Sequence, residues 1–166
     1  WSSNVGTIMG SKAVPVVKDN SKAQIELGRK LFFDKRLSID NTVSCVSCHD
    51  PKRAFTDGKK FSEGVEGKLG FRNAPTLLNV VEATSFMFDA EIKTLEEQAI
   101  VPIQDHVEMD ISMGDLIRKL RSIPEYNERS QEIFNKEFDA SVLTRSLAAF
   151  QKTLISKNSL FDQFLA

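Results

Sequence analysis

The chain is poor in several residue types, and each shortage excludes a class of protein. Only two of its 166 residues are cysteines, and both lie in one short motif. If the chemistry of that motif uses both thiols, none remains for a structural disulfide, and packing must stabilise the fold. No apolar run approaches the roughly 20 residues of a membrane-spanning helix, so we expect no membrane span. The formal net charge is −1 and no basic run occurs, which argues against nucleic acid and anionic membranes as partners.

The start of the chain has no visible export signal. It opens with Trp1 and lacks a charged region followed by an apolar one. Residues 1–20 show little periodicity, and we expect them to form an arm. The remaining residues, 21–166, have a length that suits one domain with a single sizeable core.

The motif that holds both cysteines is Cys45-Val46-Ser47-Cys48-His49. Cys-x-x-Cys-His is the signature of covalent haem c attachment. Thiols three residues apart on one helical turn can both form thioethers with the haem vinyl groups, and His49 then provides the proximal iron ligand. A redox dithiol is an alternative, although the adjoining histidine and the lack of a βαβ pattern count against it. Zinc would need a fourth ligand, such as the distant His106.

Covalent haem attachment also predicts where the protein works. Such a protein matures across the bacterial inner membrane, so we expect a periplasmic protein whose signal peptide has been removed.

Twelve of the chain's residues are Phe, against one Trp and one Tyr. Phe adds apolar area without a polar atom, which suits the surroundings of a haem, and a Phe-rich core explains the same composition.

The apolar periodicity is helical throughout, so we expect an all-α fold with long loops. Ser21 and Gln24 form a capping box before an amphipathic helix through Leu31. Three later helices are expected to begin at Thr94, at Ser112, and at Asp139 or Ser141, and another starts with Pro124. Pro102 is expected to end the helix that Thr94 begins.

A glycine-rich polar stretch, residues 52–73, separates the haem motif from the next apolar segment. Loops of this length in compact domains are usually functional or mobile, and ligand exchange or partner contact is one interpretation. An ordinary haem-covering loop is the other. Arg72, at its end, could pair with a haem propionate.

Several further stretches resemble one family, the bacterial di-haem cytochrome c peroxidases, which include the MauG proteins. The resemblance runs from about Leu27 to the C-terminus and matches the N-terminal, cytochrome c-like domain of these proteins. It is carried by the haem motif and by Leu27–Asp34, Arg72–Asn79, Leu95–Ala99 with Pro102, Val107–Met109 and Ser159–Leu165.

The resemblance implies peroxide chemistry. In the family this N-terminal haem reduces hydrogen peroxide, and a glutamate and a glutamine handle the peroxide on its distal side. The matching positions are Glu108 and Gln98. A carboxylate beside the iron can move a proton from one peroxide oxygen to the other, and an amide can orient peroxide without adding charge. The implied partners are hydrogen peroxide, a small periplasmic electron donor such as a cytochrome or cupredoxin, and a second haem domain or subunit.

The sequence departs from the family first on the distal side. Switchable members place a removable histidine ligand in the glycine-rich loop, near the position of Val65, and no histidine occurs in that loop here. Either the distal site is open, which favours peroxide binding, or another residue closes it. The candidates for that ligand are His106, Met109, Met113 and Met87.

Two other departures concern the second haem. Where members often carry a tryptophan between the haems, this chain has Phe88, which is harder to oxidise. Asn73 matches a residue associated with calcium between the two domains, and the resemblance covers only the first of them, either as one domain of a longer protein or as a mono-haem relative. Two classes stay open: a peroxidase with one covalently bound haem c, and a mono-haem electron carrier or partner subunit without peroxidase activity.

Overall fold

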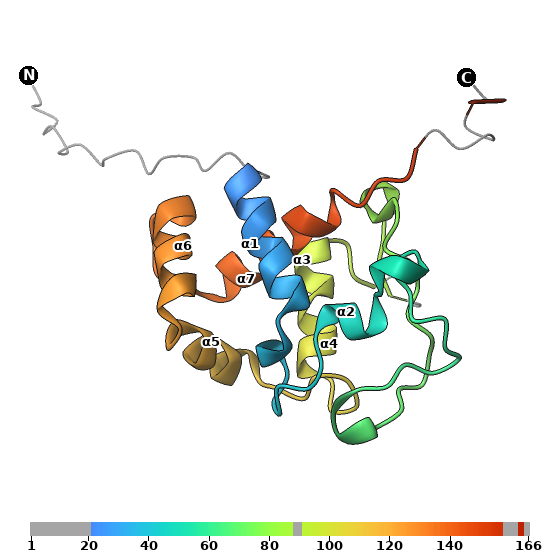
Figure 1. Ribbon diagram of the computed structural model, residues 1–166, viewed down its shortest axis with the longest axis horizontal. Helices are drawn as coiled ribbons and strands as arrows, with labels where there is room; N and C mark the ends of the chain where they lie inside the picture. Colours follow the sequence, from blue (N-terminus) through green and yellow to red (C-terminus); the bar gives the residue numbers. More distant parts are fainter. Residues whose placement is uncertain (1–20, 88–90, 158–162, 165–166) are drawn as a thin grey trace, which may run out of the picture.

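The structure is a computed structural model that describes residues 21–87, 91–157 and 163–164 (Figure 1). This part of the chain is helical, with isolated bridges and no strand, which confirms the all-α prediction. The proposed arm, residues 1–20, lies outside the described residues. The helices are α1 (Lys22–Phe33), α2 (Cys45–Cys48), α3 (Leu95–Gln98), α4 (Ile100–Gln104), α5 (Met113–Arg121), α6 (Pro124–Phe134) and α7 (Ala140–Gln151).

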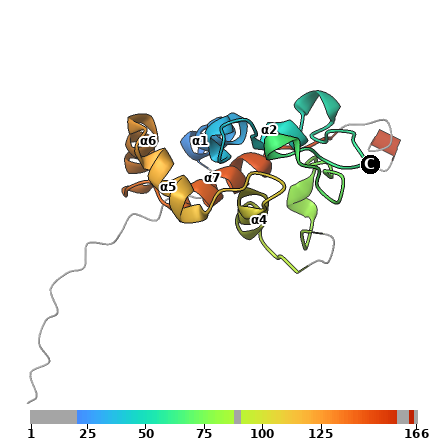
Figure 2. The same ribbon diagram turned by 90° about the horizontal axis from the view of Figure 1, so that it is seen from below.

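Helices α1 and α7 cross at the centre of the molecule, with α5 and α6 at one end and the irregular segment after α2 at the other (Figures 1 and 2). The crossing is close because α1 has a glycine at the contact. A Cβ atom on Gly28 would lie 1.8 Å from the carbonyl oxygen of Ser146. The side chain of Gln24 adds a hydrogen bond of 3.1 Å to the Arg145 carbonyl of α7.

The helix starts follow local capping rules. Ser21, Thr94, Ser112 and Asp139 each accept a hydrogen bond from a backbone N–H in the first turn of α1, α3, α5 and α7. Asp139, rather than Ser141, therefore caps α7.

The prediction that Pro102 ends a helix was wrong. The chain breaks between α3 and α4 at Ala99, and Pro102 lies inside α4, which continues to Gln104. Proline is tolerated there because the N–H groups of a helix's first turn have no partner within the helix.

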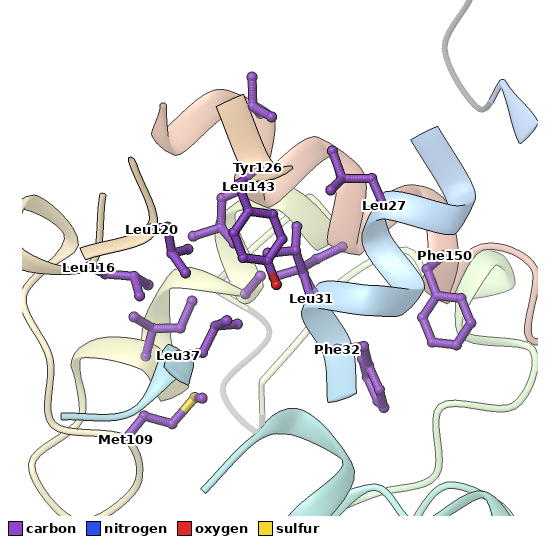
Figure 3. Close-up of a cluster of buried hydrophobic side chains, with 14 of the residues drawn as sticks. Leu27, Leu31, Phe32, Leu37, Met109, Leu116, Leu120, Tyr126, Leu143 and Phe150 are labelled. Atoms are coloured by element: carbon purple, nitrogen blue, oxygen red, sulfur yellow. The ribbon is translucent and has the colours of Figure 1, made fainter. Parts of the chain in front are cut away.

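The hydrophobic core lies between α1, α5, α6 and α7 (Figure 3). Leu31, Leu116 and Leu120 are fully buried in it. The Tyr126 ring is also fully buried, and its hydroxyl donates a hydrogen bond to the Asp34 carboxylate at the end of α1. Burial opposes ionisation of Asp34, but hydrogen bonds from Arg36 and Tyr126 outweigh it and lower the pKa of this carboxyl.

The phenylalanines divide between several environments. Phe32 packs against Phe150 with ring centroids 5.2 Å apart, and both rings lie at the edge of the core (Figure 3). Phe134 and Phe138 are buried in the core itself, whereas Phe71 is 82% exposed. Among the described residues, Phe32 is the one phenylalanine that borders the cavity described below. The Phe content therefore reflects the core more than the surroundings of a cofactor.

Candidate haem site

A cavity lies between α1, α2, the end of α3 and the end of α7. Its empty volume is about 650 Å³, part of it open to solvent. The predicted residues Cys45, Cys48, His49, Gln98 and Glu108 all border it. The apolar part of its wall includes Phe32, Val43, Leu77, Ala99, Pro102, Ile103, Met109 and Leu147. The structure thus brings the haem motif and the two expected distal residues to one space.

Helix α2 is a single turn that presents both thiols to this cavity. The backbone N–H of Ser44 donates to Ser47 Oγ at 3.1 Å, which fixes the start of the turn. Residues three apart on a helix share one face, so Cys45 and Cys48 point the same way. The two cysteines form no disulfide. Burial raises the pKa of the Cys45 thiol to about 12 and that of Cys48 to about 11, so both are protonated near neutral pH.

The His49 imidazole is oriented by the backbone. Its Nδ1 lies 3.0 Å from the carbonyl oxygen of Phe55, and because a carbonyl can only accept, Nδ1 carries the proton. Ala54 and Phe55 both adopt positive φ, and the Phe55 N–H donates to the Asp50 carbonyl at 2.8 Å. Burial lowers the pKa of His49 and so favours the neutral ring. The remaining nitrogen, Nε2, keeps its lone pair for a metal, as in most histidine ligands.

The expected distal residues come from α3 and from the turn after α4. Gln98 is the last residue of α3, and the Glu108 N–H donates to the Asp105 carbonyl at 3.1 Å in a tight turn. Burial, and then the negative charge of Asp105, raise the pKa of the Glu108 carboxyl. A carboxyl with a raised pKa at a cavity wall is a candidate for proton transfer.

The glycine-rich loop forms a backbone hydrogen bond with Glu108. The Val65 N–H donates to the Glu108 carbonyl at 2.8 Å, and the Val65 side chain is fully buried. Gly64 packs so closely here that a Cβ atom on it would lie 2.1 Å from the Val107 carbonyl oxygen and 2.5 Å from that of Glu108. Val65, near which the resemblance places the removable histidine, is therefore held against the backbone of the expected acid/base residue.

Other residues singled out in the sequence lie elsewhere. Arg72 and Asn73 are exposed and do not border the cavity, so their roles toward a propionate and calcium stay predictions. The His106 side chain is 91% exposed and contacts Asp110. Met87 and Met113 also lie away from the cavity, and Met109 is the one candidate sixth ligand that borders it. Phe88 lies outside the described residues.

Gln151 is a cavity residue that the sequence interpretation missed. It is the last residue of α7, is only 4% exposed, and its Oε1 has no hydrogen-bond partner among the described residues. Four residues after Leu147, it falls on the apolar face of the helix. A polar residue on that face is the signal that could have identified it.

The residues at this cavity fit a covalently attached haem c. Two thiols on one helical turn, an imidazole with a bare nitrogen and a mostly apolar wall are the donors and surroundings that such a haem needs. An unpartnered buried amide at the wall is also typical of a site that a ligand completes. Zinc finds no support, because no group of three or more His, Cys, Asp or Glu side chains in the described part of the chain is placed to hold a metal ion.

Comparisons with known proteins identify a family for this chain. Residues 22–166 match the family described as di-haem cytochrome c peroxidase. The methylamine utilization protein MauG of Methylophilus methylotrophus is 35% identical over 141 residues, which cover 84% of this chain and 42% of the relative. Cytochrome c551 peroxidase of Pseudomonas aeruginosa is 38% identical over 150 residues, which cover 87% of this chain and 43% of the relative.

Solved structures give the same result. The crystal structure of a MauG-like protein associated with microbial copper homeostasis superposes with a TM-score of 0.82 at 30% identity, covering 99% of this chain and 50% of that one. The chain thus spans less than half the length of the two curated relatives above. No helix in the described residues is long and apolar enough to cross a membrane. The chain belongs to the di-haem cytochrome c peroxidase family, for which haem c is the expected cofactor.

Proposed function

We propose that this chain is a periplasmic peroxidase domain that carries one haem c and reduces hydrogen peroxide to water. The observation that carries the proposal is the Glu108 carboxyl, which borders the same cavity as His49 and has a raised pKa. The balanced reaction consumes one peroxide, two protons and two electrons and yields two waters. When bound through Cys45 and Cys48, the haem supplies the redox chemistry of the O–O cleavage.

The chain's own residues would handle the protons. Glu108 would accept a proton from one peroxide oxygen and return it to the other, which would leave as water. Burial raises the pKa of Glu108 and so makes its carboxylate a better proton acceptor than an exposed glutamate. Gln98 orients peroxide with its amide and adds no charge. His49 keeps its orientation through the Phe55 carbonyl.

The two electrons would come from outside the described site. The names of the relatives, cytochrome c peroxidases among them, support a protein donor, and we propose a small periplasmic cytochrome or cupredoxin. Because the matched relatives are more than twice as long as the aligned part, a second haem domain or subunit is a further candidate for one of the two electrons.

Substitution of Glu108 by glutamine tests the proposal. We expect ferric wild-type holoprotein to be high-spin and to react rapidly with peroxide, and Glu108→Gln to slow that reaction by about 10²- to 10⁴-fold because the proton transfer is lost. Glu97→Gln, at an exposed carboxyl of α3, is the matched control and should react like the wild type. A low-spin spectrum that peroxide leaves unchanged would refute the proposal.

One observation favours a second function, that of an electron carrier. Met109 borders the cavity and is only 3% exposed, and methionine ligation raises the haem potential and suits electron transfer. In that case the ferric protein is six-coordinate and low-spin, and Met109→Leu converts it to high-spin. An unchanged spectrum in Met109→Leu would exclude Met109 as the ligand.

A further inference from the structure

Three buried polar atoms of residues that border the haem cavity have no hydrogen-bond partner among the described residues: Ser44 Oγ, Ser62 Oγ and Gln151 Oε1. The two hydroxyls can rotate to donate or accept, whereas the amide oxygen of Gln151 can only accept. Gln151 ends α7 with its side chain 96% buried, and its Oε1 has no partner among the described residues. A buried amide oxygen without a hydrogen bond is costly, so a site usually keeps one only where a ligand supplies the donor. Gln151 is also the polar end of an otherwise apolar wall that includes Leu147 and Phe32.

The end of α7 is fixed against the helix that carries Gln98. Lys152, the next residue after Gln151, forms an ion pair of 3.0 Å with Glu96 of α3. Gln98 follows two residues after Glu96 and ends that helix. The Lys152 N–H also continues the α7 hydrogen bonds to Ala148, so the helix is regular up to this point. Gln151 and Gln98 thus border the cavity from two helices that an ion pair locks together.

The chemistry of the oxygen defines the ligand it can hold. An amide Oε1 only accepts, so its partner must carry a hydrogen on oxygen or nitrogen. Haem propionates are ionised and accept as well, and they cannot satisfy this atom. Hydrogen peroxide carries two O–H groups and no charge. The same cavity also presents Gln98 and Glu108, which can exchange hydrogen bonds with such a molecule.

We propose that Gln151 is a third peroxide-binding residue, whose Oε1 accepts a hydrogen bond from a peroxide O–H in the haem cavity. The proposal rests on the proposed function and adds to it: Glu108 moves the proton, and the two glutamines orient the molecule. Gln151 acts only by holding peroxide, so its loss weakens binding and leaves proton transfer intact.

Ligand titrations of the holoprotein test the proposal. Fluoride accepts hydrogen bonds and never donates, so Oε1 disfavours it. We expect Gln151→Leu to bind fluoride in the ferric state about three- to tenfold more tightly and to react with dilute peroxide about three- to tenfold more slowly. Gln151→Glu keeps an acceptor and adds negative charge, and should bind fluoride more weakly than the wild type. Carbon monoxide binding to the reduced protein, which needs no acceptor, should not change in Gln151→Leu.

Controls separate this effect from damage to the fold. Gln131→Leu, on the exposed face of α6, makes the same change away from the cavity and should bind all three ligands like the wild type. The Soret absorbance per protein shows whether each variant carries haem. If Gln151→Leu carries no haem, Gln151→Glu still tests the proposal, because it should bind fluoride more weakly than the wild type.

The outcomes are distinct. Fluoride binding that is unchanged in both Gln151 variants overturns the inference, because Gln151 then does not face the ligand. Weaker fluoride binding in Gln151→Leu also overturns it, because the amide then donates through Nε2. Wild-type protein that binds neither fluoride nor peroxide refutes the proposed function itself, and with it the role of Gln151.

Discussion

Gly64 offers a direct test of how the glycine-rich loop positions the expected acid/base residue. The change is Gly64→Ala. Its φ of −106° is open to any residue, so the backbone conformation itself adds no strain. The new Cβ would lie 2.1 Å from the Val107 carbonyl oxygen and 2.6 Å from the Glu108 Cα atom. Because these are backbone atoms, no side-chain rotation relieves the overlap.

The size of the effect follows from the distances. Ordinary contact requires the loop and the 107–108 turn to separate by about 1 Å, and overpacking of this kind costs about 1–3 kcal/mol in the free energy of unfolding. Reduced freedom of the unfolded chain returns about 0.4–1 kcal/mol. A displacement of about 1 Å at a catalytic group can slow a reaction by about 10²-fold. We therefore expect Gly64→Ala to lose about 1–2 kcal/mol of stability and most of its reaction with peroxide.

Urea unfolding followed by circular dichroism measures the stability, and stopped-flow absorbance of the ferric haem measures the peroxide reaction. Gly70→Ala in the same loop is the matched control, since its Cβ would meet its nearest atom, the Ser62 carbonyl oxygen, at 3.4 Å. It should resemble the wild type in both assays. A Gly64→Ala protein that reacts with peroxide as fast as Gly70→Ala would show that the loop does not set the position of Glu108.

Two further predictions concern the core. Gly28→Ala should destabilise the fold by about 2 kcal/mol in the same urea assay, because overpacking against Ser146 exceeds the gain of about 1 kcal/mol in helix propensity. Gly114→Ala in α5 is the control. Its Cβ would have no neighbour closer than 3.8 Å, so this variant should be neutral or stabilising. Asp34→Asn should lose about 1–2 kcal/mol at pH 7, where the carboxylate accepts from Arg36 and Tyr126. Because the folded pKa of Asp34 is lowered, its contribution is present above the unfolded value of about 4 and is lost as the pH falls through the folded value. Urea unfolding at pH 7 and pH 3 should therefore show a smaller stability gap between the two proteins at pH 3, and an equal gap at both values would contradict the assignment.

Local signals predicted much of the fold. Ser21, Thr94, Ser112 and Asp139 cap helices because a short polar side chain can satisfy an N–H only a few residues away. The failure at Pro102 has a tertiary cause. Whether proline ends a helix or lies in its first turn depends on where the preceding turn breaks, and Ala99 carries no local signal for a break.

The candidate site was predictable in its residues and less so in its arrangement. Cys45, Cys48 and His49 follow from a motif, and Gln98 and Glu108 follow from family resemblance, and all five border one cavity. The hydrogen bond from Val65 to Glu108 joins backbone atoms 43 positions apart in the sequence, and no side-chain pattern encodes it. Gln151 was not predicted as a cavity residue because apolar periodicity assigns its helix face to the core.

The crossing of α1 and α7 has a consequence for the order of assembly. It joins residues 22–33 to residues 140–151, so the core cannot close until nearly the whole domain has been synthesised. The attachment motif lies about 100 residues before the end of α7 in the sequence. Until α7 packs, Cys45 and Cys48 have neither the Leu147 wall nor Gln151 beside them. A chain that reaches the haem-attachment step before this crossing forms therefore exposes both thiols to haem, and packing of α7 then closes the cavity over it.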